Sequence, residues 1–107
     1  MTMSGDQANS GGVPAQTDTF VREVPITNKR GLHARASAKF VQMVEQFDAD
    51  ITVTRNGETV GGTSIMGLMM LAAGIGTTIQ ISARGREAET ALNAIADLIA
   101  NKFGEDE

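Results

Sequence analysis

The chain has 107 residues, of which 41% are apolar and four are aromatic, all of them Phe. This length is typical of one compact domain with a modest core, built here from Ile, Leu, Val, Met and Ala. The absence of cysteine excludes disulfides and thiolate chemistry, and it favours a cytoplasmic location. The first twenty residues have neither the basic start nor the apolar run of a signal peptide, and no stretch is apolar enough to span a membrane.

The net charge of −4 is unevenly distributed. Residues 19–47 carry five basic and two acidic side chains, whereas residues 48–107 carry four basic and nine acidic ones. An acidic chain without interleaved aromatic and basic residues is a poor candidate for binding nucleic acid. The local basic segment instead favours a phosphate or an acidic protein surface as its partner.

Residues 1–18 are rich in Gly, Ser, Gln, Asp and Thr and contain almost nothing to bury. This composition predicts a disordered leader, followed by one folded domain over residues 19–107. Residues 20–27 then alternate as a strand, with Phe20, Val24 and Ile26 on one side. Pro25 cannot donate a ladder hydrogen bond, so we expect this strand at a sheet edge or with its proline nitrogen facing outward.

The period becomes helical from Ala34 to about Phe47, with Phe40 and Phe47 beside an apolar stripe made of Ala34, Ala38, Val41 and Val44. Strands are predicted at 48–55, 58–62 and 77–85, and the Asn56-Gly57 pair between the first two is a strong hairpin signal. Ser64 can cap a short helix over residues 65–72, and a last helix covers about 87–103. The order β-α-β-β-α-β-α predicts an α+β fold, an open two-layer sandwich whose four-stranded antiparallel sheet is covered on one face by three helices.

The only histidine, His33, lies at the predicted start of the 34–47 helix. A lone histidine usually carries no chemistry, but the unpaired amides and the dipole of a helix start provide a site for an anion. Gly31 allows a tight turn into the helix, and Arg35 can bring its guanidinium to the same anion. A nucleophile, an anion cradle and an arginine together suit accepting and passing on a phosphoryl group. A metal site is not expected without cysteine or nearby carboxylates at ligand spacing, and a hydrolytic triad lacks its third member.

Two motifs resemble a known family. The stretch "GLHARASA" at residues 31–38 closely resembles the active-site signature of HPr, the histidine phosphocarrier of the bacterial phosphoenolpyruvate-dependent phosphotransferase system. The stretch "TSIMGLMML" at residues 63–71 is similar to the family's regulatory-serine helix, and the predicted element order matches from Phe20 to Phe103. The resemblance therefore covers 84 of the 107 residues.

This resemblance implies specific roles. His33 would take the phosphoryl group on Nδ1 from enzyme I and pass it to an enzyme IIA-type acceptor, with Arg35 steadying the group. The chain around Gly31, Ala34 and Arg35 would cradle its oxygens. Ser64 matches the serine that HPr kinase/phosphorylase modifies in many members, a change that hinders transfer through the histidine. Ala36 departs from the family, where proline is commonest, and mainly restores one amide donor in the first helical turn.

Ser64 by itself needs no role beyond capping, because serine is a favoured N-cap residue. On the helix after it, Leu68 and Leu71 can face the sheet, but the remaining apolar residues cannot all do so. Exposed methionine suits a surface that accepts several partners. With the family's docking helix in mind, we assign four residues to the interface with enzyme I and the acceptors: Ile65, Met66, Met69 and Lys39.

Three functions remain open. The first is phosphoryl transfer through His33 by a carrier that is not a stand-alone catalyst and needs no cofactor. The second is a mainly regulatory binding module in nitrogen or carbon control, switched by phosphorylation of Ser64. The third is a small-ligand regulatory domain with an incidental histidine. In each case we expect a cytoplasmic monomer that binds neither nucleic acid nor membrane. The acidic "GEDE" at residues 104–107 is interpreted as structural and solvating.

Overall fold

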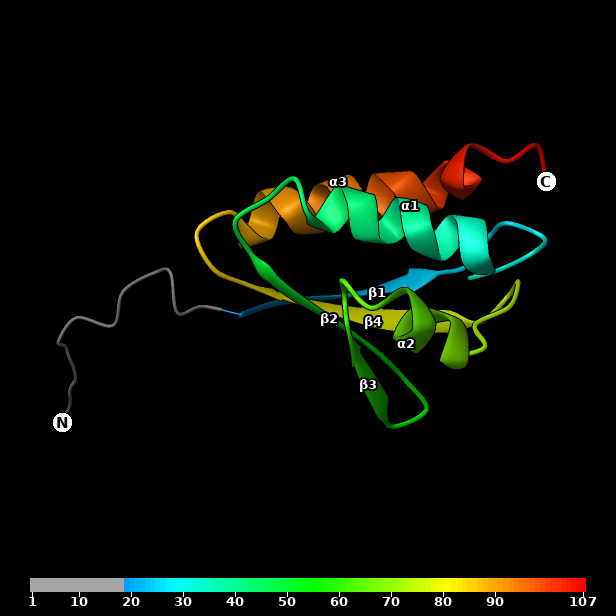
Figure 1. Cartoon of the computed structure of the whole chain (residues 1–107), viewed down its shortest axis with the longest axis horizontal. Helices are drawn as coiled ribbons and strands as arrows, with labels where there is room; N and C mark the ends of the chain where they lie inside the picture. Colours follow the sequence, from blue (N-terminus) through cyan, green and yellow to red (C-terminus); the bar gives the residue numbers. More distant parts are fainter. Residues whose placement is uncertain (1–18) are drawn as a thin grey trace, which may run out of the picture.

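An antiparallel sheet of four strands in the order β1-β4-β2-β3 forms one layer of the computed structural model (Figure 1). The strands are β1 (Thr19–Pro25), β2 (Asp50–Arg55), β3 (Glu58–Gly61) and β4 (Thr78–Arg84). The structure describes residues 19–107, so the predicted leader at 1–18 lies outside the described residues. The strand β1 lies at the edge, and the adjacent Ile26 makes the hydrogen bonds to Thr77 and Gly76, so the Pro25 nitrogen faces outward and costs no ladder hydrogen bond, as predicted.

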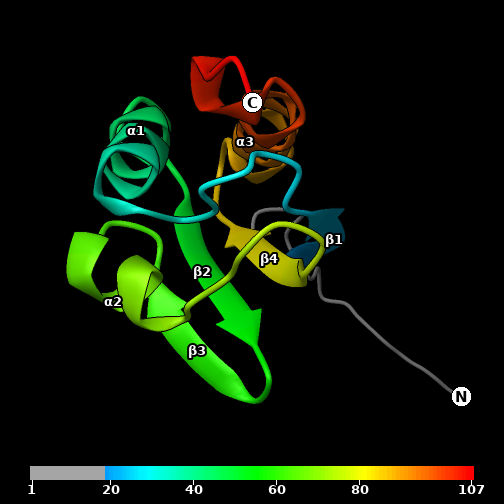
Figure 2. The ribbon, with the colours of Figure 1, turned by 90° about the vertical axis from the view of Figure 1, so that its right-hand side faces the viewer.

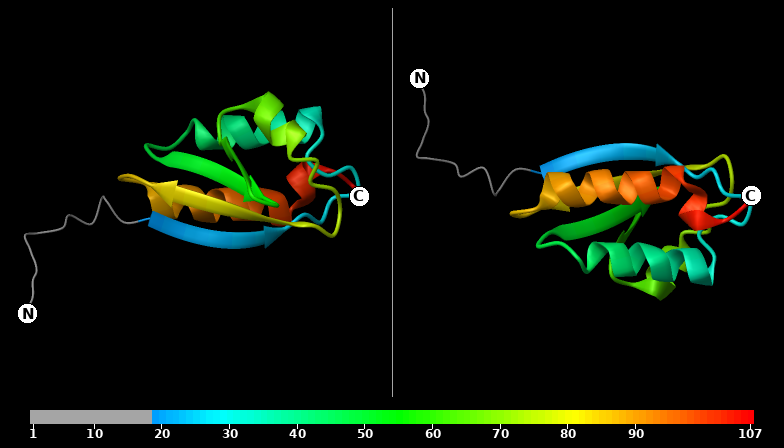
Figure 3. Two further views of the ribbon diagram at one scale, coloured as in Figure 1. Left: turned by 90° about the horizontal axis from the view of Figure 1, so that it is seen from below. Right: turned by 90° about the horizontal axis from the view of Figure 1, so that it is seen from above.

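Three helices cover one face of this sheet: α1 (Ala34–Val44), α2 (Ile65–Met70) and α3 (Ala88–Ala100) (Figure 2). The helix α3 packs on β1 and β4, α1 lies beside α3, and α2 lies against α1 and β3 (Figure 3). The predicted order β-α-β-β-α-β-α and the open two-layer architecture are therefore confirmed. No helix within residues 19–107 combines the length and the apolar character needed to cross a bilayer.

The core lies between the two layers and consists mainly of aliphatic side chains, as the composition predicts. Val53 of β2 and Ile81 of β4 are paired neighbours in the sheet, and both are fully buried. The hairpin between β2 and β3 turns at Asn56 and Gly57, which both have positive φ, at 52° and 81°. The Asn-Gly signal therefore identified this turn correctly.

Two predicted core faces need correction. Phe20 has the same parity as Val24 on β1, but it lies near the start of this edge strand and is 36% exposed. The buried face of α1 does not contain Ala34, which is exposed. The rotation of α1 follows from Phe40, which is fully buried, because a large aromatic side chain gains more from burial than alanine does. The buried residues of α1 are accordingly Ala36, Ser37, Phe40, Val41 and Val44.

Two helix ends also differ from prediction. The helix α1 ends at Val44, and the amides of Gln46 and Phe47 bond to carbonyls three residues back instead of four. The helix α3 ends at Ala100 and is followed by a short turn, η2 (Lys102–Gly104). Phe103 still reaches the core and is 1% exposed, but it does so from a backbone with φ of 56°. This reversal sends residues 104–107 back toward the start of α1.

Candidate functional site

His33 is the N-cap residue of α1, as the sequence predicts. Its backbone is extended, with φ −73° and ψ −179°, and its side chain makes no capping hydrogen bond. The first amide with an intrahelical partner is that of Ser37, which donates to the His33 carbonyl at 2.8 Å. The amides of residues 34–36 have no intrahelical acceptor, and the first turn contains no acidic side chain. This helix start can therefore receive an anion.

Gly31 makes the turn into α1, with φ of +66°. A Cβ atom at this position would lie 2.4 Å from the carbonyl oxygen of Ala73 and 2.9 Å from Cα of Gly74. The next amide, that of Leu32, donates to the same Ala73 oxygen at 3.0 Å. The segment after α2 is thus held directly against the start of α1.

This close approach creates a shallow hollow beside His33. It is lined by residues from the turn before α1 and from the end of α2 with the segment after it: Arg30, Leu32, His33, Met69, Ala72, Ala73 and Gly74. Of the α2 residues assigned to an interface, only Met69 lines this hollow.

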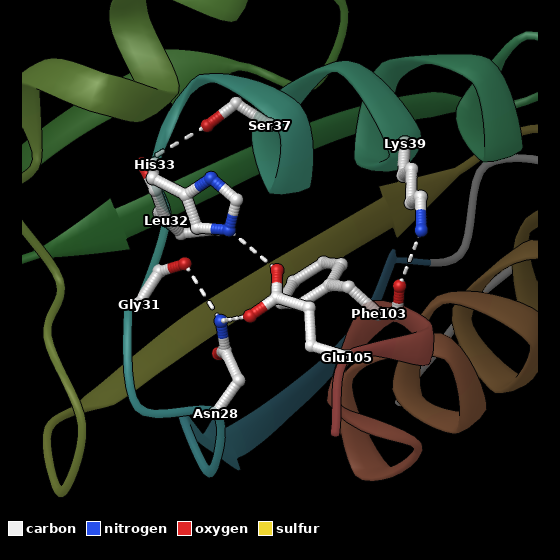
Figure 4. A network of polar contacts seen from close by, with 8 residues as sticks. All are labelled: Asn28, Gly31, Leu32, His33, Ser37, Lys39, Phe103 and Glu105. Atoms are coloured by element: carbon white, nitrogen blue, oxygen red, sulfur yellow. Dashed lines mark hydrogen bonds and ion pairs between the residues drawn. The ribbon is translucent and has the colours of Figure 1, made fainter. Parts of the chain in front are cut away.

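The imidazole of His33 contacts a carboxylate from the far end of the sequence (Figure 4). Its Nε2 atom forms a hydrogen bond or ion pair with Oε2 of Glu105, and both side chains are mostly buried, with exposed fractions of 16% and 17%. Within residues 19–107, no hydrogen bond is made by Nδ1 of the same ring. Glu105, for which the sequence predicts only a structural and solvating role, is therefore in direct contact with the candidate site.

Asn28 holds the same carboxylate. Its Nδ2 donates to Oε1 of Glu105 at 3.0 Å and to the carbonyl of Gly31 at 2.9 Å, and its side chain is fully buried. Burial by itself raises the pKa of Glu105. The hydrogen bonds from Asn28 and His33, with the charges of His33 and Arg30, outweigh this effect and bring the pKa of Glu105 below its ordinary value. The carboxylate is therefore held in its ionised form.

The acidic segment, residues 104–107, is fixed at both ends. Lys39 Nζ donates to the Phe103 carbonyl at 2.6 Å, and the Lys29 amide donates to the Glu107 carbonyl at 2.5 Å. Lys29 and Glu107 also form an ion pair at 3.3 Å, but both side chains are 72% exposed, so this pair contributes little to stability. Lys39, which we assigned to a partner interface, is thus engaged within the fold.

A second hollow lies on the side of the acidic segment. Arg35 lines it, as do Arg30 and Glu105, so the predicted phosphoryl-binding arginine and the carboxylate partner of His33 share one cavity. The remaining lining residues are Lys29, Lys39, Gly104, Asp106 and Glu107. The side chain of Arg35 forms no hydrogen bond or ion pair with the rest of residues 19–107 and is free to approach an anion.

The helix α2 has the exposed apolar face that the sequence predicts. Leu68 and Leu71 are buried, at 0% and 3% exposure. Ser64 is the N-cap residue, and its Oγ accepts a hydrogen bond from the Gly67 amide at 2.9 Å, which confirms the predicted cap. The large apolar residues exposed on and after this helix are Ile65, Met66, Met69, Met70 and Ile75, of which the last two were not assigned to the interface.

Comparison with known proteins decides the family. Residues 20–101 match the family model described as PTS HPr component phosphorylation site. The chain belongs to the HPr family. The phosphocarrier protein HPr of Cupriavidus necator is 50% identical over 86 residues, which are 80% of this chain and 97% of that protein. A phosphocarrier protein NPr of Shewanella violacea is 43% identical over 84 residues, or 78% of this chain and 92% of that one.

A solved structure agrees with this assignment. The crystal structure of HPr-C-His from Thermoanaerobacter tengcongensis has a TM-score of 0.78 and 41% sequence identity, and the match covers 82% of this chain and 99% of that one. Membership of the HPr family confirms the predicted fold and the phosphocarrier role in the phosphotransferase system. Interaction with proteins of that system follows at the level of the family.

Glu105 and Asn28 are the site residues that the motifs of the HPr family did not reveal. Asn28 lies three residues before Gly31 and looks like an ordinary turn residue. Glu105 reaches His33 only because the chain reverses at Lys102 and Phe103, and neither residue type signals positive φ. Among residues 19–107 there is no cluster of three or more His, Cys, Asp or Glu side chains that could hold a metal ion.

Proposed function

We propose that this chain carries a phosphoryl group on Nδ1 of His33, takes it from phospho-enzyme I and delivers it to an enzyme IIA-type acceptor. The observation that supports this most directly is the orientation of the imidazole at the start of α1. Its Nε2 faces Glu105, whereas its Nδ1 has no hydrogen-bond partner in the described part of the chain. The ring thus offers one nitrogen as a nucleophile at a helix start that can receive an anion.

In the proposed step, the lone pair of Nδ1 attacks the phosphorus atom. The bond between phosphorus and the donor nitrogen of enzyme I breaks, and its electron pair stays on that nitrogen. The phosphoryl oxygens meet the unpaired amides at the start of α1, those of Ala34 and Arg35 first, with Gly31 shaping the turn before them. Arg35 follows His33 by two residues on α1, and its guanidinium would add charge-assisted hydrogen bonds to these oxygens.

We further propose that the exposed residues Ile65, Met66 and Met69 dock on enzyme I and on the acceptor. Met69 borders the hollow that contains His33, so a partner seated on α2 would also cover the imidazole. A flexible apolar surface of this kind can adapt to more than one protein. The partner would then exclude water from the transfer step.

Regulation at Ser64 by HPr kinase/phosphorylase is a finer proposal. Ser64 is exposed at the start of α2, where an added phosphate would meet the positive end of the helix. It would also place negative charge beside the exposed apolar residues and weaken their docking.

The alternative function, a regulatory module of the nitrogen or carbon branch, uses this same switch without depending on transfer. In either role we place the folded domain at residues 19–107, in the cytoplasm and as a monomer.

The experiment that tests phosphoryl carriage is incubation with purified enzyme I and labelled phosphoenolpyruvate. The wild-type chain should take up acid-labile, base-stable label, and His33→Ala should take up none while keeping its circular dichroism spectrum. Arg35→Ala should slow labelling by about 10- to 100-fold, as expected for loss of one charged group at a transition state. Arg86→Ala is its matched control, because Arg86 is exposed and pairs with Asp48 in another part of the fold.

Label that persists in His33→Ala would overturn this function. The regulatory alternative is tested separately with Ser64→Asp. It predicts that Ser64→Asp changes the set of bound partners while His33→Ala leaves that set unaltered.

A further inference from the structure

The contact between Glu105 and His33 joins the acidic segment to the reacting ring. Glu105 Oε2 lies against Nε2, the ring nitrogen that does not take the phosphoryl group in the proposed function. We propose that Glu105 is a positioning residue: it keeps the imidazole proton on Nε2 and balances the charge that the ring acquires when Nδ1 is phosphorylated. This inference rests on the proposed function of His33.

The backbone around η2 directs Glu105 to this place. Three successive residues, Lys102, Phe103 and Gly104, have φ of 57°, 56° and 79°, which reverses the chain at the end of α3. Non-glycine residues adopt this conformation only where the surrounding structure enforces it. Here the Phe103 side chain is buried in the core and its carbonyl accepts a hydrogen bond from Lys39, so two interactions fix the reversal.

Asn28 determines which oxygen of Glu105 faces the histidine. Its Nδ2 is a donor only and engages Oε1, so Oε2 is the oxygen left for the imidazole. An ionised carboxylate can only accept hydrogen bonds, and the pair is therefore complete when Nε2 carries the proton. The lone pair then resides on Nδ1, where the transfer needs it. A carboxylate that orients a histidine through its second nitrogen is a general device for fixing the tautomer.

The charge balance of the step gives Glu105 a second effect. When the Nδ1–P bond forms and the P–N bond of the donor breaks, Nε2 keeps its proton and the ring becomes positively charged. The Glu105 carboxylate lies directly against the ring and offsets that charge. Arg30 and Arg35 line the same hollow as Glu105. When the acceptor takes the phosphoryl group, the electron pair of the Nδ1–P bond returns to Nδ1 and the ring is neutral again. Glu105 thus lowers the barrier to phosphorylation of Nδ1, the step in which this positive charge develops.

The test compares Glu105→Gln with Glu107→Gln in the full chain. Each removes one negative charge from the acidic segment, but Glu107 pairs with Lys29 at the surface and does not contact His33. In Glu105→Gln, Asn28 still requires an acceptor, so the new amide places its NH₂ group toward Nε2 and favours the proton on Nδ1. Labelling by enzyme I should slow by about 10- to 100-fold in Glu105→Gln. In Glu107→Gln it should change by less than about twofold.

Nitrogen-15 NMR of the His33 imidazole measures which ring nitrogen carries the proton, a property that would not change if Glu105 had a purely structural role. The neutral ring should carry its proton on Nε2 in the wild type and in Glu107→Gln, and at least partly on Nδ1 in Glu105→Gln. Glu105→Ala, which presents no group to Nε2, should give a tautomer ratio and a labelling rate between those of the wild type and Glu105→Gln. Thermal unfolding of each variant verifies that the fold is retained.

The outcomes separate this inference from the function on which it rests. Equal labelling rates for Glu105→Gln and Glu107→Gln, with the label still on His33, would overturn the role of Glu105 and leave the phosphocarrier intact. An unchanged tautomer in Glu105→Gln would do the same. A wild-type chain that takes no label from enzyme I would overturn both.

Discussion

The helices α1 and α2 begin in opposite ways. The first turn of α2 is closed by its own N-cap residue, since Ser64 Oγ accepts the Gly67 amide at 2.9 Å. The N-cap residue of α1 is His33, whose side chain makes no such bond. Serine stabilises a helix start that histidine leaves open, so α1 forgoes local stability and keeps its first amides available for an anion.

Contacts from distant parts of the chain support α1 in place of a cap. The Leu32 amide bonds to Ala73 after α2, and Glu105 reaches His33 from beyond α3. A local addition is the hydrogen bond from Ser37 Oγ in the first turn of α1 to the Leu32 carbonyl at 3.2 Å. The start of α2 is therefore determined locally, while the start of α1 depends on the whole fold, and disrupting the two should have different consequences.

The largest effect on stability is expected from Gly31→Ala. The new Cβ would meet the Ala73 carbonyl oxygen at 2.4 Å and would stand on a backbone with φ of +66°. Relief requires moving the segment after α2, which breaks the Leu32–Ala73 hydrogen bond. The strain of alanine in the left-handed backbone region and the overpacking of its Cβ against Ala73 should together lower the free energy of unfolding by about 2–5 kcal/mol, measured by urea titration. Labelling of His33 should fall as well, because the turn that places the ring is altered.

Gly57→Ala is the matched control for this variant. Gly57 has a similar φ of +81°, but a Cβ there meets nothing within 4 Å. It should cost only the conformational term of about 1–2 kcal/mol and leave labelling unchanged. Equal losses in the two variants would show that the contact with Ala73 does not hold the start of α1.

The next prediction exchanges the two kinds of helix start. Ser64→Ala removes the cap of α2 and should cost about 1 kcal/mol in the free energy of unfolding. In α1 the comparison is between His33→Ser and His33→Ala, which both lose the Glu105 contact. The serine variant should be the more stable by about 1 kcal/mol, although neither variant can take a phosphoryl group. If His33→Ser shows no advantage over His33→Ala, the start of α1 is not open in the way we describe.

The difference between local and long-range determination of the two helix starts also explains which parts of the fold and of the site could be predicted from the sequence. Period and turn residues sufficed for the element order, for the hairpin at Asn56-Gly57 and for the Ser64 cap, because each depends on neighbours in the chain. The place of His33 at a helix start was likewise a local property, predictable from Gly31 before it and the helical period after it.

The partner of His33 was not predictable in this way. An acidic segment at the end of a chain is usually solvated, and the path of Glu105 depends on Phe103 filling the core from a left-handed backbone. The prediction of the apolar face of α1 was wrong at Ala34 for a related reason: the buried face depends on what the rest of the fold packs against the helix, and there Phe40 is buried while Ala34 is exposed. Hydrophobic periodicity alone cannot predict features that depend on packing between distant parts of the chain.

The smallest effect is a pH dependence that only the start of α1 should show. The pKa of Glu105 is lowered in the folded chain, so its interactions stabilise the fold fully above the ordinary value of 4.5. As the pH falls from that value through the lower folded pKa, the unfolded chain takes up the proton first and this contribution is lost. The difference in unfolding temperature between the wild type and Glu105→Gln should therefore be steady above this pH range and shrink within it.

The corresponding difference between the wild type and Ser64→Ala should stay constant over the same range, because a hydroxyl cap does not titrate. If the Glu105→Gln difference were equally constant, the carboxylate would not support His33 through its charge, and the two helix starts would differ only in their hydrogen bonds.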